Sequence, residues 1–232
     1  LGQNHRETIA ALGSLANVYA LLQRYEEAEK CMAKTFARAC EVLTEGDPLR
    51  LKVRHDMVVI LRGICGGRSP DRYAEAEASI AEVIRDRMRY LGEDHEDTLL
   101  SLQLQALLIS GQGRWQEAEH LFVKLLERSK RVLGEDSIVQ LQTQQALVEV
   151  LRAQKRNQEA GPLILDILGR RSRLLGVDHP ETLLALRSLA DNLVSKGFEA
   201  EARALYSASN SRELDREVKR LQNESMDRSA TN

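Results

Sequence analysis

Few residues in this sequence have the type and spacing that catalysis requires. His95-Glu96 begins like the HExxH motif of zinc proteases, but Leu99 stands where the second metal-binding histidine is needed. Phosphate-cradling GxxxxGKS/T and GxGxxG patterns and the nucleophile pattern GxSxG do not occur. Glu27-Ala28-Glu29 places carboxylates beside a small residue, which suits a helix start packed against a second helix better than acid–base catalysis. The sequence therefore predicts no enzymatic activity and no cofactor.

The cysteines and the apolar runs narrow the possibilities further. Cys31, Cys40 and Cys65 are odd in number and lack metal-ligand spacing, so we expect small buried side chains in a reducing compartment. No apolar run approaches the roughly 18 residues that a membrane span needs, and the N-terminus has no signal-peptide pattern. We therefore expect a cytoplasmic protein without a metal site or a membrane partner.

The composition favours a helical globular chain. Of the 232 residues 43% are hydrophobic, which is enough for a core, whereas only 14 Gly and 4 Pro are present to build the turns of an all-β fold. Thirty-three Lys and Arg against 35 Asp and Glu give a net charge of -2, and the 3 Phe, 1 Trp and 5 Tyr are too few to stack bases. Nucleic acid is not an expected partner.

A motif recurs along the chain with a fixed period. The segment 91–98 returns in part at 133–137 and at 175–182, and a related segment opens the chain at 1–8. The alanines of a second, Glu-Ala-Glu-type motif lie at 28, 76, 118, 160 and 202, so one interval is 48 residues and three are 42. The six extra residues fall in the Gly- and Pro-containing segment 63–71, which predicts a longer turn. Because the chain opens inside the motif without Met, we expect a fragment of a longer protein.

Each period contains two apolar stripes with helical spacing. Leu186, Leu189 and Leu193 belong to the first stripe of their repeat, and Leu121 and Leu125 to the second stripe of an earlier one. We call the two predicted helices A and B. Each exposes an apolar face that only the next repeat can cover, which is typical of a solenoid.

Residues between the stripes predict where the helices end and begin. Gly134 and Gly176 follow the B stripe and suit a helix C-terminus, while Asp136 and Asp178 stand where the next helix needs an N-cap. Pro180 fits a first helical turn.

The array is predicted to contain five helix–turn–helix repeats in one solenoid domain, residues 1–210. The predicted repeats are 1–43, 44–91, 92–133, 134–175 and 176–210. Leu214, Val218 and Leu221 show helical spacing, so a capping helix is expected over 211–223. The tail 224–232 is expected to be disordered.

The two motifs resemble a known repeat family. Leu-Gly-Val-Asp-His-Pro-Glu-Thr at 175–182 and Gly-Arg-Trp-Gln-Glu-Ala-Glu at 113–119 are similar to the 42-residue tetratricopeptide repeats (TPR) of kinesin light chains, also found in fungal NLR-like proteins. The resemblance covers residues 1 to about 210. It implies an all-α, right-handed superhelical solenoid whose A helices line a concave groove.

The same resemblance implies a non-enzymatic scaffold that binds a protein or peptide in that groove. The polar and charged residues expected to face the groove, in addition to Leu184, are Asn17, Lys52, His55, Arg62, Gln103, Gln142, Gln145, Glu149, Arg152, Arg187 and Asp191. Four cations against two carboxylates predict an acidic segment or a C-terminal carboxylate as the ligand.

Three alternatives use the same array differently. The chain is also compatible with a sensor or autoinhibitory domain of a larger fungal NLR-like NTPase, and with an RNA-binding solenoid, although its basic stripe is thin for phosphate binding. As an oligomerisation domain it would self-associate through the solenoid end at residues 1–22, where helix A lacks a preceding repeat.

Overall fold

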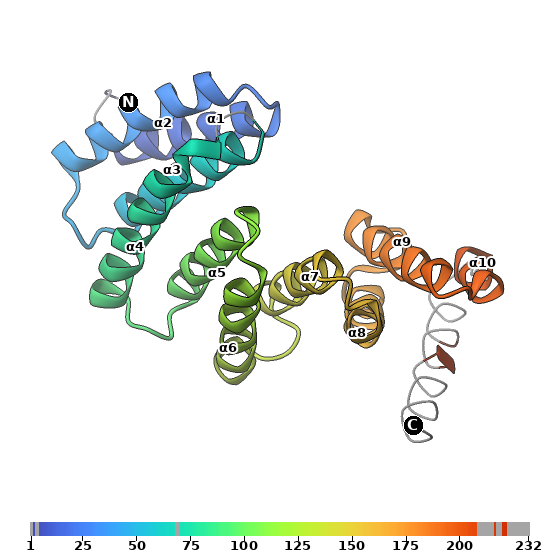
Figure 1. Ribbon diagram of the computed structural model, residues 1–232. Helices are drawn as coiled ribbons and strands as arrows, with labels where there is room; N and C mark the ends of the chain where they lie inside the picture. The colour runs from blue at the N-terminus through green and yellow to red at the C-terminus, as the bar shows by residue number, and fades with distance from the viewer. Residues whose placement is uncertain (1, 3–4, 68–69, 208–215, 217–219, 222–232) are drawn as a thin grey trace. The chain divides into compact units, whose positions relative to one another are not determined.

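The computed structural model describes residues 2, 5–67, 70–207, 216 and 220–221, and within these residues it contains α- and 3-10 helices and no strand (Figure 1). The α-helices are α1 (Arg6–Leu21), α2 (Tyr25–Val42), α3 (Pro48–Gly67), α4 (Tyr73–Tyr90), α5 (Glu96–Gly111), α6 (Trp115–Leu133), α7 (Ile138–Ala153), α8 (Asn157–Leu175), α9 (Pro180–Ser195) and α10 (Glu199–Ser207). The longer turn predicted at 63–71 is only partly a turn, because residues 63–67 continue helix α3 and Pro70–Arg72 form the 3-10 helix η1. Odd-numbered helices are the predicted A helices, and even-numbered helices are the B helices.

The helices form two compact units, unit 1 (Leu1–Val132) and unit 2 (Leu133–Asn232). In unit 1 each helix from α1 to α4 packs against the next, and α3 also contacts α1 and α5. In unit 2 the consecutive helices α7 to α10 pack in the same way. Of the capping helix predicted at 211–223, only Arg216, Arg220 and Leu221 are described, and all three are helical. The predicted disordered tail lies outside the described residues.

Histidine is the recurrent N-cap of the A helices. His5, His95 and His179 each accept, through Nδ1, a hydrogen bond from the backbone N–H two residues later, and Ser137 caps α7. The prediction that Asp136 and Asp178 are the N-caps is wrong because both lie one residue too early. Their carboxylates precede the cap position, so the side chain of the following residue reaches the free N–H groups of the first turn.

Glycines end the B helices as predicted. Gly92, Gly134 and Gly176 have φ of 95°, 85° and 86°, a left-handed conformation that residues with a Cβ rarely adopt. The chain therefore turns from one repeat into the next at the same point of each period.

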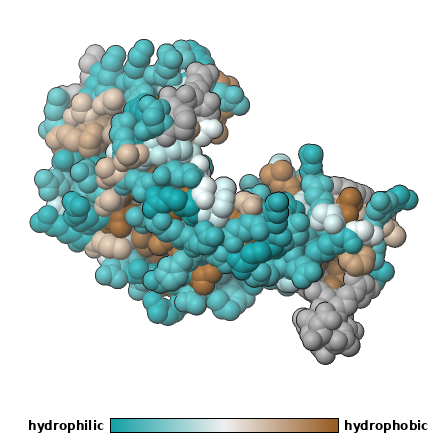
Figure 2. Space-filling view, in the orientation of Figure 1, coloured by the Kyte–Doolittle hydropathy of each residue, from teal (hydrophilic) through white to brown (hydrophobic). Residues whose placement is uncertain are grey.

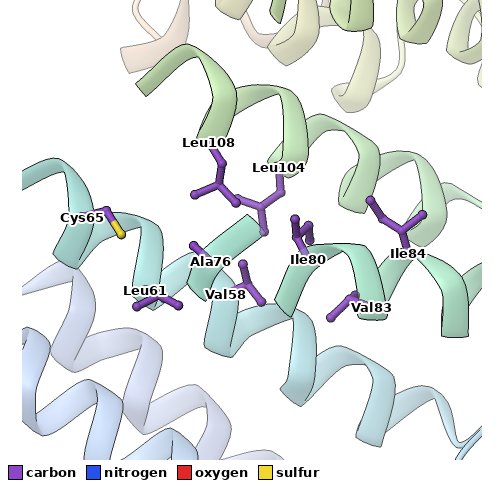
Figure 3. Packing of buried hydrophobic residues seen from close by; sticks show 9 residues of the cluster. All are labelled: Val58, Leu61, Cys65, Ala76, Ile80, Val83, Ile84, Leu104 and Leu108. Atoms are coloured by element: carbon purple, nitrogen blue, oxygen red, sulfur yellow. The ribbon is translucent and has the colours of Figure 1, made fainter. Parts of the chain in front are cut away.

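Buried aliphatic side chains form the cores that hold the helices of unit 1 together. One cluster joins α3, α4 and α5, as Figure 3 shows. Its buried members are Val58, Leu61, Cys65, Ala76, Ile80, Val83, Ile84, Leu104 and Leu108. A second cluster joins α1, α2 and α3 around Ala28 and Met32, both fully buried.

The three cysteines were expected to be buried, but only Cys65 is. Burial raises the pKa of the Cys65 thiol. Cys31 is half-buried and Cys40 is exposed.

The aromatic residue before the Glu-Ala-Glu motif contacts the next A helix. The Tyr25 ring lies on Gly63, where a Cβ would stand 2.5 Å from Tyr25 Cε1. Tyr73 repeats the contact on Gly111, where a Cβ would stand 2.6 Å from Tyr73 Oη. These glycines let the ring and the helix backbone approach closely.

An ion-pair ladder joins the turns that precede the B helices. Arg72 donates through Nε to Glu75 of its own repeat at 2.8 Å and through Nη2 to Glu29 of the preceding repeat at 2.7 Å. Arg114 makes the same two kinds of contact one repeat later. The glutamates of the Glu-Ala-Glu motif therefore link neighbouring repeats, which explains their periodicity without acid–base chemistry.

Candidate protein-binding surface of the A helices

In unit 1 three of the predicted groove residues, Asn17, Lys52 and His55, are bound to side chains that were not predicted. Asn17 donates through Nδ2 to Asp56 Oδ2 at 3.0 Å, and Lys52 donates through Nζ to the same oxygen at 2.8 Å. Asp56 was not among the predicted residues, and it offsets the charge of Lys52. Gln103 is buried, whereas Arg62 is exposed. The positive excess expected of the groove is therefore reduced in unit 1.

His55 is half-buried and belongs to a polar cluster around the buried Arg87 and Ser101 rather than to an open surface. Its Nδ1 lies 3.2 Å from Ser101 Oγ, and burial, aided by the charge of Arg87, lowers its pKa to about 4. Arg87 is 2% exposed and donates through Nη1 to Ser101 Oγ at 2.8 Å and to the carbonyl oxygen of Asp97. His55 is consequently neutral at pH 7 and helps to join α3, α4 and α5.

A second buried arginine lies at the equivalent position of unit 2. Arg171, 4% exposed, donates through Nη2 to Glu181 Oε2 at 2.8 Å and through Nη1 to the Glu181 carbonyl at 3.2 Å. Gln145 Oε1 accepts a longer bond from Nη1 at 3.5 Å. Burial lowers the pKa of both Arg87 and Arg171. The two are 84 residues apart, twice the repeat length, so their recurrence is visible in the sequence.

The predicted groove residues of unit 2 converge on one cavity of about 430 Å³ between α7, α8 and α9. Six of the residues that line it were predicted: Gln142, Gln145, Glu149, Arg152, Arg187 and Asp191. Leu184, also expected to face the groove, lines it as well. Arg171, Glu181 and Ser188 complete the lining and were not predicted.

Charges in this cavity balance, with three arginines against three carboxylates. Arg171 is held by Glu181, and Arg152 donates through Nη2 to the Ser188 carbonyl, with its Nη1 3.8 Å from Glu149 Oε1. Glu149 also accepts a bond of 3.1 Å from Gln145 Nε2. The two recessed arginines therefore already have partners.

Arg187 and Asp191 differ from the other charged residues of the cavity. Both are exposed, and neither makes a hydrogen bond or an ion pair with any residue that the structure describes. They stand four residues apart on α9 and are open to a ligand.

The described residues give no support for a metal site or a membrane-spanning helix. No group of three or more His, Cys, Asp or Glu that could hold a metal ion occurs among the residues described. No described helix combines the length and apolar character that crossing a bilayer requires. The face seen in Figure 2 is mostly hydrophilic, with hydrophobic residues in separate patches.

Comparisons with known proteins agree with the helical repeats. One tetratricopeptide repeat model matches residues 101–160, and a second matches residues 8–49 and 141–181. Together the two models match more than half of the chain. A search of curated proteins finds no match.

Solved structures show the same fold. One is the structure of the kinesin light chain nearly identical TPR-like repeats from Podosopora anserina, whose sequence is 21% identical to this chain. The match covers 95% of this chain and 97% of the other, with a TM-score of 0.64. BtubC (BKLC) from P. vanneervenii is 16% identical, with coverage of 94% and 82% and a TM-score of 0.68. The chain belongs to the tetratricopeptide-repeat family and has an all-α array of the kinesin-light-chain type.

Proposed function

We propose that this protein is a non-enzymatic scaffold that binds an extended segment of a partner protein across α7 and α9. Tetratricopeptide repeats suggest a protein-interaction role, and the kinesin-light-chain type of array is a non-enzymatic scaffold. The single observation that carries the proposal is the cavity of about 430 Å³, which is lined by A-helix side chains of two consecutive predicted repeats and by Arg171 of the B helix α8. Its volume lies within the range of about 300–1,000 Å³ that is typical of ligand sites. Its lining is mainly polar and charged, which suits a peptide segment better than an apolar small molecule.

The lining supplies the contacts that an extended peptide needs. The amides of Gln142 and Gln145 can donate to and accept from a peptide backbone, and exposed Leu184 offers an apolar contact. Arg187 has no internal partner among the described residues, so its guanidinium is available for an acidic side chain or a C-terminal carboxylate. We therefore propose that an acidic group of the partner binds Arg187.

Arg187→Ala is expected to weaken binding about tenfold, because an exposed charge-assisted contact contributes on the order of 1.4 kcal/mol. Peptides selected from a random display library on the wild-type chain would be titrated against both proteins by fluorescence anisotropy. Arg173→Ala is the matched control, since Arg173 is an exposed arginine on α8 that does not line the cavity. Equal affinities of the wild type and Arg187→Ala for every selected peptide would refute the proposal.

A second candidate, self-association, is supported by the exposed face of α1. Leu15, Val18 and Leu22 are 42%, 48% and 61% exposed, although Ile60 and Leu108, at the positions equivalent to Val18 in α3 and α5, are 1% and 0% exposed. In those later helices the preceding repeat covers the face. On α1 the same apolar face is open to a second copy of the chain.

Val18→Lys is expected to shift any dimer of this chain to monomer, because a lysine in the centre of the apolar face would lose its hydration on association. Sedimentation velocity over a range of concentrations measures the change, with Ala10→Lys, at an exposed site beside the face, as the control. A wild-type chain that stays monomeric at the highest concentration would exclude this second candidate.

A further inference from the structure

We infer that the segment bound by α7 and α9 carries charges of both signs, an acidic group that meets Arg187 and a basic group that meets Asp191 and Glu149. The inference rests on the proposed function and assigns the chemistry of its ligand. The sequence predicted a purely acidic segment. We infer instead a segment in which a carboxylate and a cation are separated by a fixed spacing.

The first observation is a row of carboxylates on neighbouring A helices. Glu149 and Asp191 are 42 residues apart and occupy the same repeat position on α7 and α9. Both are exposed and both line the cavity. One helical turn earlier, the equivalent positions hold Gln145 and Arg187. A segment that crosses the two helices therefore meets carboxylates along one side and an amide and a guanidinium along the other.

The second observation is which charges are still open. Arg171 is bonded to Glu181, and Arg152 is bonded to the Ser188 carbonyl. Arg187 is therefore the arginine that a ligand carboxylate can reach without displacing an internal partner of the described cavity. In the same way, Asp191 can bind a ligand cation without displacing an internal partner among the described residues.

A ligand with acidic groups alone would meet a repulsive element here. Any carboxylate placed beyond Arg187 toward the C-terminus of α9 comes close to Asp191, and on α7 it comes close to Glu149. Like charges brought together at an interface disfavour the wrong partner. The cavity thus selects against uniformly acidic segments.

The carboxylate row is not a requirement of the repeat itself. In unit 1 the same repeat position is occupied by Asn17, Val59 and Leu107 on α1, α3 and α5. Helices of this array form equally well without an acidic group there. Since the fold does not demand Glu149 and Asp191, ligand recognition is the better explanation for two exposed carboxylates in register.

The test exchanges the two open charges. The double variant Arg187→Asp with Asp191→Arg keeps the net charge of the chain and changes only exposed side chains, so its thermal unfolding should match that of the wild type. The probes are the tightest peptide selected on the wild type and a second peptide in which each acidic residue is exchanged for lysine and each basic residue for glutamate.

The wild type is expected to prefer the selected peptide by at least about tenfold, and the double variant to prefer the charge-reversed peptide. Asp191→Asn should weaken the selected peptide as Arg187→Ala does. Selected peptides that contain acidic groups only, or a preference that the charge exchange leaves unchanged, would overturn the inference while the groove stays the binding site. If no peptide responds to Arg187→Ala or to the exchange, the proposed function itself fails.

Discussion

Replacing Arg87 by alanine should lower the free energy of unfolding by about 2–5 kcal/mol. The side chain is 2% exposed, so its removal leaves a cavity among α3, α4 and α5. The change also leaves the Asp97 carbonyl without the donor that Arg87 Nη1 supplies and takes one donor from Ser101 Oγ. Both effects act in the same direction, and together they place the loss in the upper part of the range for a single substitution.

Urea denaturation followed by circular dichroism measures this loss. Arg85→Ala is the matched control, because Arg85 is an exposed arginine on the same helix and its removal should change the free energy by less than about 0.5 kcal/mol. Arg87→Met restores most of the volume and should fall between the wild type and Arg87→Ala. Coincident midpoints for Arg87→Ala and Arg85→Ala would mean that the buried arginine does not join these helices.

Ala28→Leu should destabilise unit 1 by about 1–3 kcal/mol. Ala28 is completely buried on α2, in the cluster that it shares with Ile9, Ala16 and Met32. Three additional carbon atoms at this site must push the neighbouring side chains or helices apart. The small residue of the Glu-Ala-Glu motif therefore sets how closely the A and B helices approach.

Ala33→Leu provides the comparison for this effect. Ala33 lies on the exposed side of the same helix, so the same chemical change there should alter stability by less than about 0.5 kcal/mol. Differential scanning calorimetry measures the melting temperatures of the two variants and so shows which face of α2 is buried. A lower melting temperature for Ala33→Leu than for Ala28→Leu would show that α2 is rotated relative to the structure.

Most of the fold could be predicted because its determinants are local and repeat. The glycines at 134 and 176 and the alanines of the second motif at 76, 118, 160 and 202 recur at 42-residue intervals. Each marks a helix end or a close helix contact. The N-caps were misassigned because aspartate is a usual residue there, whereas this chain uses Ser137 and His179, each one residue later. The periodicity of the histidines was visible in the sequence. The sequence did not indicate that a ring nitrogen of each histidine accepts a hydrogen bond from the first turn of the helix.

The division into two units could not be predicted. The 42-residue period runs unchanged through residues 132 and 133, so the sequence pattern predicts one array. Where an array divides depends on how tightly particular side chains pack, and periodicity carries no information about that.

The candidate site was predictable in position but not in charge. Counting along the repeats grouped six residues of α7 and α9 that line one cavity in the structure, because equivalent positions of successive A helices lie on the same face. Lys52 and Asp56 lie four residues apart on α3, so their pairing could have been predicted from spacing. The pairing of Arg171 with Glu181 depends on side-chain geometry between α8 and α9, which spacing does not determine. The expected excess of positive charge was therefore larger than the surface provides.

The central claim is that α7 and α9 form the surface that binds a protein segment. Chemical-shift mapping of the isotope-labelled chain during titration with the tightest selected peptide tests it most directly. The largest shifts are predicted at Gln142, Gln145, Leu184, Arg187 and Asp191, which line the cavity, with Arg173 unchanged. Shifts concentrated on the B helices or confined to unit 1, with the cavity residues unmoved, would contradict the account.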